Sequence, residues 1–262
     1  KLPAELDVDA CKLINDAQPP GARKVRPGEP PFPALWSAKE LNGLKALFPA
    51  AYWSALYMQA PTLEGGGIYQ RKWWQVWPAE KPLPDVFYVM QVWDTAYDDE
   101  EAQNDFSVCI TWGLFYLPAV PGRGDGKPRV ALMMLGKYRE RVEFPTLRIQ
   151  ARAEYRRWND GACGPVDLVL IEPKASGKSL LQELHRVGVM AMPWNPERGG
   201  QGMELSKIAS AHAASVVLYG GCVWYPEGKL WAEQIVDECA DFPAGEHDAQ
   251  QDCCKIAWLW LR

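Results

Sequence analysis

The chain has 262 residues, of which 48% are hydrophobic and 23% are charged, and its formal net charge is −5. This composition excludes disorder across the whole chain, and the 22 Gly and 22 Pro residues form no triplet repeat. No segment approaches eighteen uninterrupted apolar residues, and the first ten residues lack the layout of a signal peptide. The sequence therefore predicts a globular protein that neither spans nor anchors in a membrane.

The first eighty residues are rich in Pro, which repeatedly interrupts regular structure. One helix is well signalled there, because Ser37 and Glu40 have the spacing of a capping box before an apolar run. A second short helix is expected over residues 50–58. We place a boundary near residues 78–84, so that residues 1–80 form a Pro-rich linker segment and residues 81–262 form the main domain.

Beyond this boundary, strands and helices alternate. Three consecutive strands are expected at 86–93, 107–116 and 130–138, with PGRGDGKPR as the hairpin turn between the last two. The later elements expected are helices at 145–158, 179–187, 204–218, 229–239 and 247–261, and strands at 167–171, 189–193 and 222–225. This order predicts an α/β fold with a mixed sheet flanked by helices on both faces.

Basic residues are concentrated in one part of the chain. Residues 121–157 contain ten Lys or Arg residues and only four Asp or Glu residues, so this stretch carries +6 and the remainder −11. A basic strip beside an acidic body suits an enzyme that holds a polyanion near a carboxylate metal site. We take Arg139 and Arg141 as DNA-binding candidates, with Lys174 and Lys178 as further phosphate contacts. The alternative is that these side chains are simply solvated.

Four acidic residues stand where predicted elements begin or end. Asp94 closes the first long strand, Glu172 closes a buried strand, and Asp248 and Asp252 open the last helix. If the two strands are neighbours, Asp94 and Glu172 would lie within bridging distance of one cation, and the last helix could bring a third carboxylate. Oxygen ligands suit Mg²⁺ or Mn²⁺. Equally, an acid at a strand end is often an ordinary turn residue or helix cap.

Several short segments, in this order, resemble the nuclease part of the large terminase subunit of tailed bacteriophages. They are WDTA at 93–96, NDFSV at 104–108, TWG at 111–113, LIEPKASG at 170–177, GCVWYP at 221–226 and FPAGEHDAQQD at 242–252. Residues 55–74 are similar to the segment by which the ATPase domain of this family passes into its nuclease. No single motif is specific, but the ordered set covers nearly the whole chain.

The resemblance implies a ribonuclease-H-like fold and a two-metal-ion endonuclease that cuts double-stranded viral DNA during packaging. It maps Asp94 and Glu172 onto the first two catalytic carboxylates, and Asp248 is our expected third, with Asp252 as a further metal ligand. The family usually shows His-Asp-Asp at the third position, whereas Ala249 replaces the second Asp here. Three explanations are open: an engineered inactivating change, which we favour because the neighbouring residues keep the pattern, a natural variant in which Asp248 or Asp252 substitutes, or a degenerate nuclease.

The resemblance also implies partners outside this chain. Residue 1 is Lys, and no phosphate-binding loop of the GxxxxGK[ST] type is present, so we expect an ATPase domain upstream of residue 1. The expected partners are double-stranded DNA, a portal ring and a small terminase subunit, in the cytoplasm of the host cell. The alternative function is a non-catalytic module that grips or docks DNA. A carbohydrate-active enzyme is a poorer explanation, because it leaves the basic strip unused.

Overall fold

The computed structural model describes residues 8–17, 24–26, 30, 37–45, 67–96, 106–118, 128–161, 163–194, 207–245 and 247–262. The chain divides into two compact units, Lys1–Gly65 and Gly66–Arg262. The helix expected over residues 50–58 and most of the expected hairpin turn at 121–129 lie outside the described residues.

The first unit contains two described helices, α1 (Val8–Ala17) and α2 (Ala38–Lys45). The sequence analysis predicted only α2, and its capping box is confirmed. The Ser37 backbone N–H donates to Glu40 Oε2 at 2.8 Å, and the Glu40 backbone N–H donates to Ser37 Oγ at 3.3 Å. These reciprocal bonds satisfy donors that the first turn leaves without partners, so the chain begins a helix at this point.

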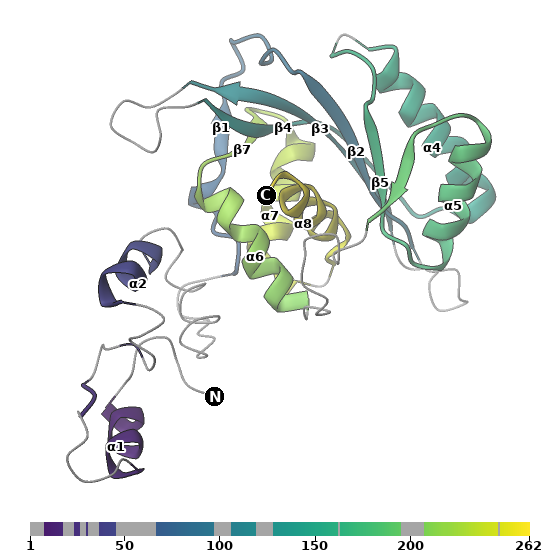
Figure 1. The fold of residues 1–262 in the computed structure, drawn as a ribbon. Coiled ribbons are helices and arrows are strands. Elements are labelled where there is room, and N and C mark those ends of the chain that lie inside the picture. The colour runs from purple at the N-terminus through teal and green to yellow at the C-terminus, as the bar shows by residue number, and fades with distance from the viewer. Residues whose placement is uncertain are drawn as a thin grey trace. The chain divides into compact units, whose positions relative to one another are not determined.

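The second unit is built on a seven-stranded sheet with the order β1-β7-β4-β3-β2-β5-β6 (Figure 1). The strands are β1 (Gln75–Trp77), β2 (Tyr88–Asp94), β3 (Ser107–Leu117), β4 (Arg129–Glu140), β5 (Leu168–Ile171), β6 (Ala191–Pro193) and β7 (Val223–Pro226). The central strands β2, β3 and β4 pair antiparallel, and the other pairings are parallel. The mixed sheet predicted from the sequence is confirmed.

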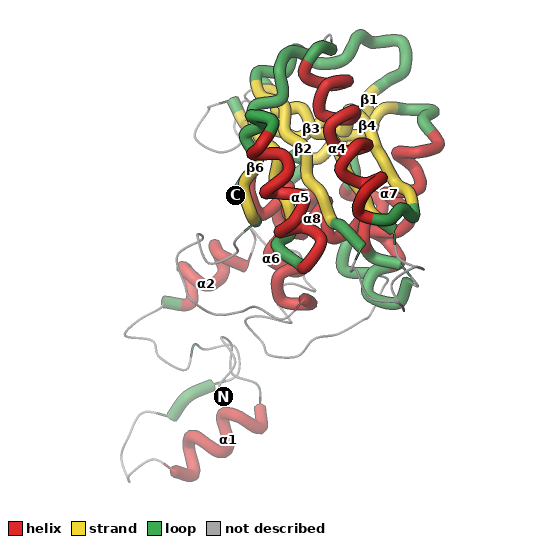
Figure 2. Tube along the Cα trace, turned by 90° about the vertical axis from the view of Figure 1, so that its right-hand side faces the viewer, coloured by secondary structure: helices red, strands yellow, loops and turns green. Residues whose placement is uncertain are grey.

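Helices cover both faces of this sheet, which is why its central strands are almost continuously apolar. Successive residues of β2 alternate between two hydrophobic clusters: Val89 and Trp93 belong to one, Met90 and Val92 to the other. The first cluster includes residues of α4 (Phe144–Asn159) and α5 (Ala175–Arg186), which lie in front of the strands in Figure 2. The second includes residues of α6 (Lys207–Tyr219), α7 (Leu230–Asp241) and α8 (Ala249–Leu261).

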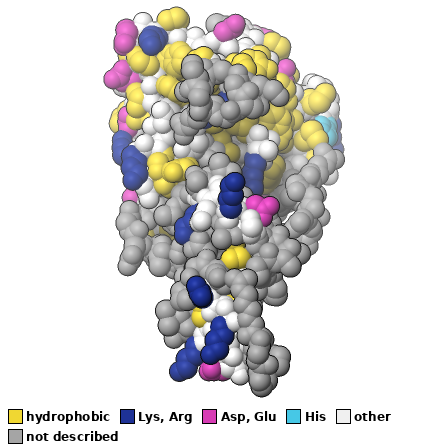
Figure 3. Space-filling view, turned by 60° about the vertical axis from the view of Figure 1, so that its left-hand side comes forward, with side chains coloured by type: hydrophobic (Ala, Val, Ile, Leu, Met, Phe, Trp, Pro, Cys, Tyr) yellow, Lys and Arg dark blue, Asp and Glu magenta, His cyan; other side chains and the backbone are white. Residues whose placement is uncertain are grey.

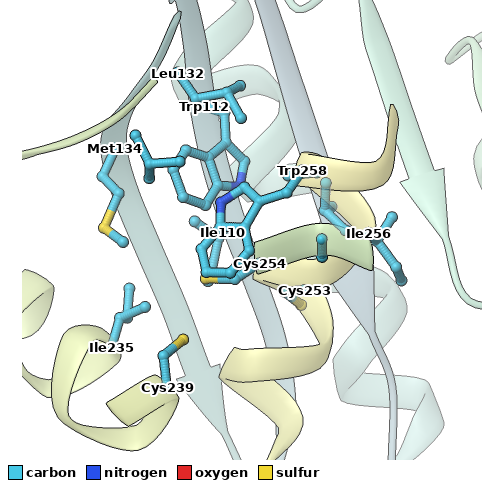
Figure 4. Close-up of a cluster of buried hydrophobic side chains, with 14 of the residues drawn as sticks. Ile110, Trp112, Leu132, Met134, Ile235, Cys239, Cys253, Cys254, Ile256 and Trp258 are labelled. Carbon is cyan, nitrogen blue, oxygen red and sulfur yellow. The ribbon is translucent and has the colours of Figure 1, made fainter. Parts of the chain in front are cut away.

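Helix α8 is the most deeply packed of these helices. Its Trp258 extends toward Trp112 of β3 (Figure 4), and Cys253, Cys254 and Ile256 of the same helix belong to the same hydrophobic cluster. The side chains of all five residues are buried. A large-to-small replacement of such a residue typically costs about 2–5 kcal/mol, so α8 is held firmly against the sheet.

The surface of this unit carries both hydrophobic and charged side chains. In Figure 3, hydrophobic side chains gather on the upper part of the face that is drawn, between scattered Lys and Arg side chains. The exposed rings of Phe87 and Tyr116 stack with their centroids 4.5 Å apart. None of the helices within the described residues is both long enough and apolar enough to cross a membrane.

Two differences from the expected elements have clear causes. Helix α5 begins at Ala175, four residues earlier than predicted, because Gly177 lets its first turn lie against the end of β5. A Cβ atom at residue 177 would come within 2.1 Å of the Glu172 carbonyl oxygen. The three-residue strand β1 was not predicted, since it lies in the Pro-rich stretch. The division into a linker at 1–80 and a nuclease domain at 81–262 remains a prediction.

Candidate metal centre

Neighbouring strands place two of the predicted carboxylates at the same edge of the sheet. Strands β2 and β5 are parallel, and the pairing Trp93 with Ile171 puts Asp94 and Glu172 at the carboxyl ends of both. The Glu172 backbone N–H donates to the Trp93 carbonyl at 3.0 Å, which fixes these ends relative to each other. The adjacency of the two strands, which the sequence argument required, is confirmed.

The third carboxylate comes from the first turn of α8 and belongs to Asp252. One carboxylate oxygen of Asp94, of Glu172 and of Asp252 lies within 4.8 Å of the others. Asp94 and Asp252 are buried, and Glu172 is partly buried. We call these three residues the acidic cluster. Its three members are far apart in the sequence, and the sheet edge and α8 bring them together.

Hydrogen bonds fix the loop after β2 against α5. The Ser176 hydroxyl donates to the Ala96 carbonyl, so Thr95 acts as donor in the 2.8 Å contact between its hydroxyl and that of Ser176. Both hydroxyl-bearing residues are buried. These bonds join the residues that follow Asp94 to the start of the helix that follows Glu172, and so help to position the two carboxylates.

A glutamate on α7 caps the start of α8. Glu238 Oε1 accepts the backbone N–H of Gln250 at 2.7 Å and that of Gln251 at 3.2 Å, while its other oxygen accepts the Gln250 side-chain amide. The residue at the N-cap position, Asp248, makes no capping bond with its own side chain. Glu238 therefore satisfies donors of the helix start and positions the turn that carries Asp252.

Lys174 bridges the first two members of the acidic cluster. Its Nζ lies 3.0 Å from Glu172 Oε2 and 3.5 Å from Asp94 Oδ1. The attraction of Asp94 and Glu172 raises the pKa of Lys174, although burial of its amine opposes this shift. Lys178, the other predicted phosphate contact on this segment, is an exposed residue of α5.

Two other lysines hold the third member. Lys255 Nζ lies 2.6 Å from Asp252 Oδ1, and Lys207 Nζ lies 2.9 Å from Asp252 Oδ2. Lys207 also contacts Asp248. Burial alone would raise the pKa of Asp252, but the ammonium groups of Lys255 and Lys207 outweigh burial and hold that pKa below its usual value. Asp252 is therefore ionised and fully paired.

Asp94 has the opposite electrostatic environment. Burial raises the pKa of Asp94 well above its usual value, and the charge of Glu172 raises it further, while Lys174 only partly offsets both effects. Two carboxylates this close are stable only with a proton or a cation between them. This end of the acidic cluster is therefore the part that would gain most from a divalent cation.

The donor set fits a hard divalent cation. All three members offer carboxylate oxygen, which favours Mg²⁺ or Mn²⁺ over ions that prefer sulfur or imidazole. Glu172 Oε2 is a buried atom that contacts the ammonium group of Lys174 at 3.0 Å, so a cation would bind this oxygen in place of Lys174. Asp94, Glu172 and Asp252 are the residues that would hold the ion.

Asp248, the expected third catalytic residue, lies outside the acidic cluster. Its side chain is 48% exposed and contacts Lys207. The helix starts at Ala249, so residue 248 stands at the N-cap while residue 252, one turn later, faces the sheet. Ala249 itself is only 8% exposed and packs in the hydrophobic cluster under α8.

The predicted DNA-binding arginines lie near the same edge. Arg139 pairs across strands with Val108, which pairs with Asp94, so Arg139 is two strands, or roughly 10 Å, from Asp94. The guanidinium groups of Arg139 and Arg141 lie 3.7 and 4.1 Å from the centroid of the Phe106 ring. These two residues from the middle of the basic stretch thus lie near the edge that carries the acidic cluster.

The sequence analysis missed three residues of this centre: Lys207, Lys255 and Glu238. Lys255 stands three residues after Asp252 in a predicted helix, and this spacing was a usable signal because such residues share a helix face. Lys207 and Glu238 are on other helices, and only the packing of α6 and α7 against α8 brings them near. No sequence spacing reveals such contacts.

The fold and the acidic cluster define a mixed α/β protein with a candidate divalent-metal centre. Solved structures with this fold include the large terminase of a thermophilic bacteriophage in complex with ADP, which has a TM-score of 0.56 and 11% identity and covers 85% of this chain and 52% of that chain. The complex of the same terminase with ATP-gamma-S gives the same values. The P22 large terminase nuclease domain has a TM-score of 0.49 and 13% identity, covering 76% and 94% of the two chains.

The comparison with the thermophilic phage protein shows that this chain has the fold of a phage large terminase, as the sequence resemblance predicted. The chain spans about half the length of the large terminase chains that it matches. No protein-family model and no curated protein matches the sequence.

Proposed function

We propose that the second unit is a metal-dependent endonuclease that hydrolyses phosphodiester bonds in double-stranded DNA. The observation that supports this most is the acidic cluster, whose carboxylate oxygens converge at one edge of the sheet. A structural role explains the cluster poorly, because Lys174 bridges Asp94 and Glu172 and yet only partly offsets the burial and the charge of Glu172 that raise the pKa of Asp94. Perturbed carboxylates of this kind are typical of functional sites.

Hydrolysis at this centre would need a bound metal ion and residues that position it. A divalent ion, Mg²⁺ or Mn²⁺, would lower the pKa of a water molecule and polarise the scissile phosphate. Asp94, Glu172 and Asp252 would hold and orient the cation through their oxygens. The water oxygen adds to phosphorus, one bridging P–O bond breaks, the leaving oxygen takes one proton and solvent takes the other. The resemblance implies two ions; how many bind depends on the lysines around the cluster.

Basic residues at the same edge hold the phosphate backbone. Arg139 and Arg141 lie on the side of β4, and Lys174 and Lys178 lie on the side of β5. Contacts of this type attract DNA without reading its sequence, and their strength falls steeply with salt concentration. We therefore propose cleavage without base specificity.

In this proposal the chain serves the packaging of a phage genome in the host cytoplasm. The thermophilic phage protein is a large terminase, and its complexes are with ADP and with ATP-gamma-S. By analogy, residues 1–80 would link the nuclease at 81–262 to an ATPase domain, and a portal ring and a small terminase subunit would be its partners. These partners rest on the family resemblance alone.

The second candidate is a module that grips or docks DNA without cutting it. The specific observation that favours it is Ala249, which offers no oxygen where the resemblance expects a metal ligand. A gripping module would bind DNA with the same salt dependence, but divalent ions would not lead to cleavage.

Cleavage of supercoiled plasmid in Mg²⁺ or Mn²⁺ tests the proposal. The unaltered chain should nick the plasmid, and Asp94→Asn or Glu172→Gln should reduce nicking by at least about 100-fold, as expected for loss of transition-state charge stabilisation. Glu80→Gln, a change at an exposed glutamate, is the control and should cut normally. Plasmid that stays intact in both ions while the chain still binds DNA would favour the gripping module.

A paired comparison identifies the third ligand. Asp252→Asn should reduce nicking as strongly as Asp94→Asn, whereas Asp248→Asn should have a much smaller effect, because Asp248 is directed to Lys207. Equal losses would show that Asp248 is also needed.

A further inference from the structure

The lysines around the acidic cluster differ in how easily a metal ion could replace them. Lys174, which bridges Asp94 and Glu172, has a side chain that is 45% exposed and follows the end of β5. Lys255, which contacts Asp252, is only 11% exposed and belongs to the buried α8. Lys174 can move its ammonium into solvent when a cation arrives. Displacing Lys255 would leave a charged amine buried without its partner, which is strongly unfavourable.

We infer that the centre takes a single divalent ion, in the place of Lys174, and that Lys255 permanently supplies the positive charge of a second ion. This inference rests on the proposed nuclease function and specifies its metal content. Both oxygens of Asp252 are already engaged, one by Lys255 at 2.6 Å and one by Lys207 at 2.9 Å. The single ion can reach Asp252 through Oδ2, because Lys207 is 42% exposed and can move aside, whereas a second ion at Asp252 would also need Oδ1 and would have to displace Lys255.

The charges of the cluster balance with one ion. The three carboxylates of the acidic cluster carry three negative charges. Lys207 lies between Asp252 and Asp248, so its charge is balanced by Asp248. Lys255 then contributes one positive charge and a divalent ion contributes two, which makes the cluster neutral. A second divalent ion would leave two excess positive charges in a mostly buried site before DNA binds, at a large desolvation cost.

A second, independent observation lies on the same helix. Ala249, Asp252 and Lys255 are spaced by three residues, so they follow one another along one side of α8. Ala249 puts a methyl group in the hydrophobic cluster where the resemblance expects a carboxylate ligand. The helix therefore lacks one expected ligand and carries a buried cation one turn beyond Asp252. The missing ligand at residue 249 and the buried ammonium group of Lys255 both disfavour binding of a second ion.

The number of Mn²⁺ ions bound per chain tests this inference without measuring cleavage. Isothermal titration of the unaltered chain with Mn²⁺, without DNA, should give one ion, and direct metal analysis after dialysis should agree. Lys255→Met keeps most of the aliphatic side chain and removes its charge. The double variant Ala249→Asp with Lys255→Met should bind a second ion, and circular dichroism should show that it is folded.

The outcomes separate this inference from the proposed function. Two ions bound to the unaltered chain would overturn the single-ion inference and leave the nuclease proposal intact, and this measurement does not depend on any variant folding. No Mn²⁺ binding, or one ion that remains in Glu172→Gln, would instead remove the metal centre on which the nuclease proposal rests. A folded double variant that still binds one ion would show that Lys255 is not what excludes the second.

Discussion

Replacing Glu238 by Ala removes the group that caps α8. Its carboxylate accepts two backbone N–H bonds, at 2.7 and 3.2 Å, from Gln250 and Gln251, and its side chain is 10% exposed. Hydrogen bonds to charged groups contribute about 1.5–3 kcal/mol each, and loss of a helix cap costs about 0.5–2 kcal/mol. Because the two bonds share one oxygen, we expect Glu238→Ala to lower the free energy of unfolding by about 2–3 kcal/mol rather than by their sum. For a domain of this size that corresponds to a fall in Tm of roughly 4–12 °C.

Thermal unfolding of three variants checks this reasoning. Glu238→Gln keeps a carbonyl acceptor without the charge, so its loss should be smaller than that of Glu238→Ala. Glu233→Ala is the matched control on α7, because Glu233 forms a surface ion pair with Arg71 that should contribute no more than about 1 kcal/mol. The capping argument would be refuted if Glu238→Ala were no less stable than Glu233→Ala. If it is correct, Glu238→Ala should also weaken the stabilisation by Mn²⁺, since the capped turn carries Asp252.

Three further predictions concern the centre and its DNA. Ala249→Asp adds an oxygen ligand and should raise Mn²⁺-dependent plasmid nicking; an unchanged rate in a chain that already cuts well would show that residue 249 is not a ligand position. Replacing Arg139 and Arg141 by Gln should weaken DNA binding and reduce the slope of log affinity against log salt by about one per lost phosphate contact; Arg141→Gln alone should leave the Mn²⁺-induced rise in Tm unchanged, whereas Arg139 also pairs with Glu238 at 4.0 Å. Burial and the charge of Glu172 raise the pKa of Asp94 in the folded chain, so the folded chain binds a proton at Asp94 more tightly than the unfolded chain does. This proton stabilises the fold at low pH, and the stabilisation is lost as pH rises from the usual Asp pKa through the raised pKa. Without metal, Asp94→Asn should therefore gain stability relative to the unaltered chain as pH rises above the usual Asp pKa of about 4, and a constant difference in Tm would contradict this.

The sequence predicted the central part of the fold because its signals there are local. Strand β2 is apolar apart from Gln91 and ends in Asp94, and the apolar strand β5 is followed directly by Glu172. The positions of the two carboxylates therefore followed once the two strands were taken as neighbours. The choice between Asp248 and Asp252 was not local. It depends on where α8 begins, and Glu238 from another helix fixes that start. The sequence of α8 alone does not show where the helix begins.

The geometry of the acidic cluster also explains why the lysines could not be assigned from the sequence. Carboxylates whose oxygens lie within 4.8 Å must be neutralised before the chain meets a cation, or their repulsion would destabilise the fold. Lys174, Lys207 and Lys255 do this from a strand end, α6 and α8, so their common role exists only in three dimensions. In the sequence, Lys174 and Lys255 are simply two lysines near acidic residues. The difference in the exposure of their side chains assigns them different roles. The exposed Lys174 acts as a counter-ion that a metal can replace, whereas the buried Lys255 is a fixed part of the centre's charge and limits how much metal the centre can hold.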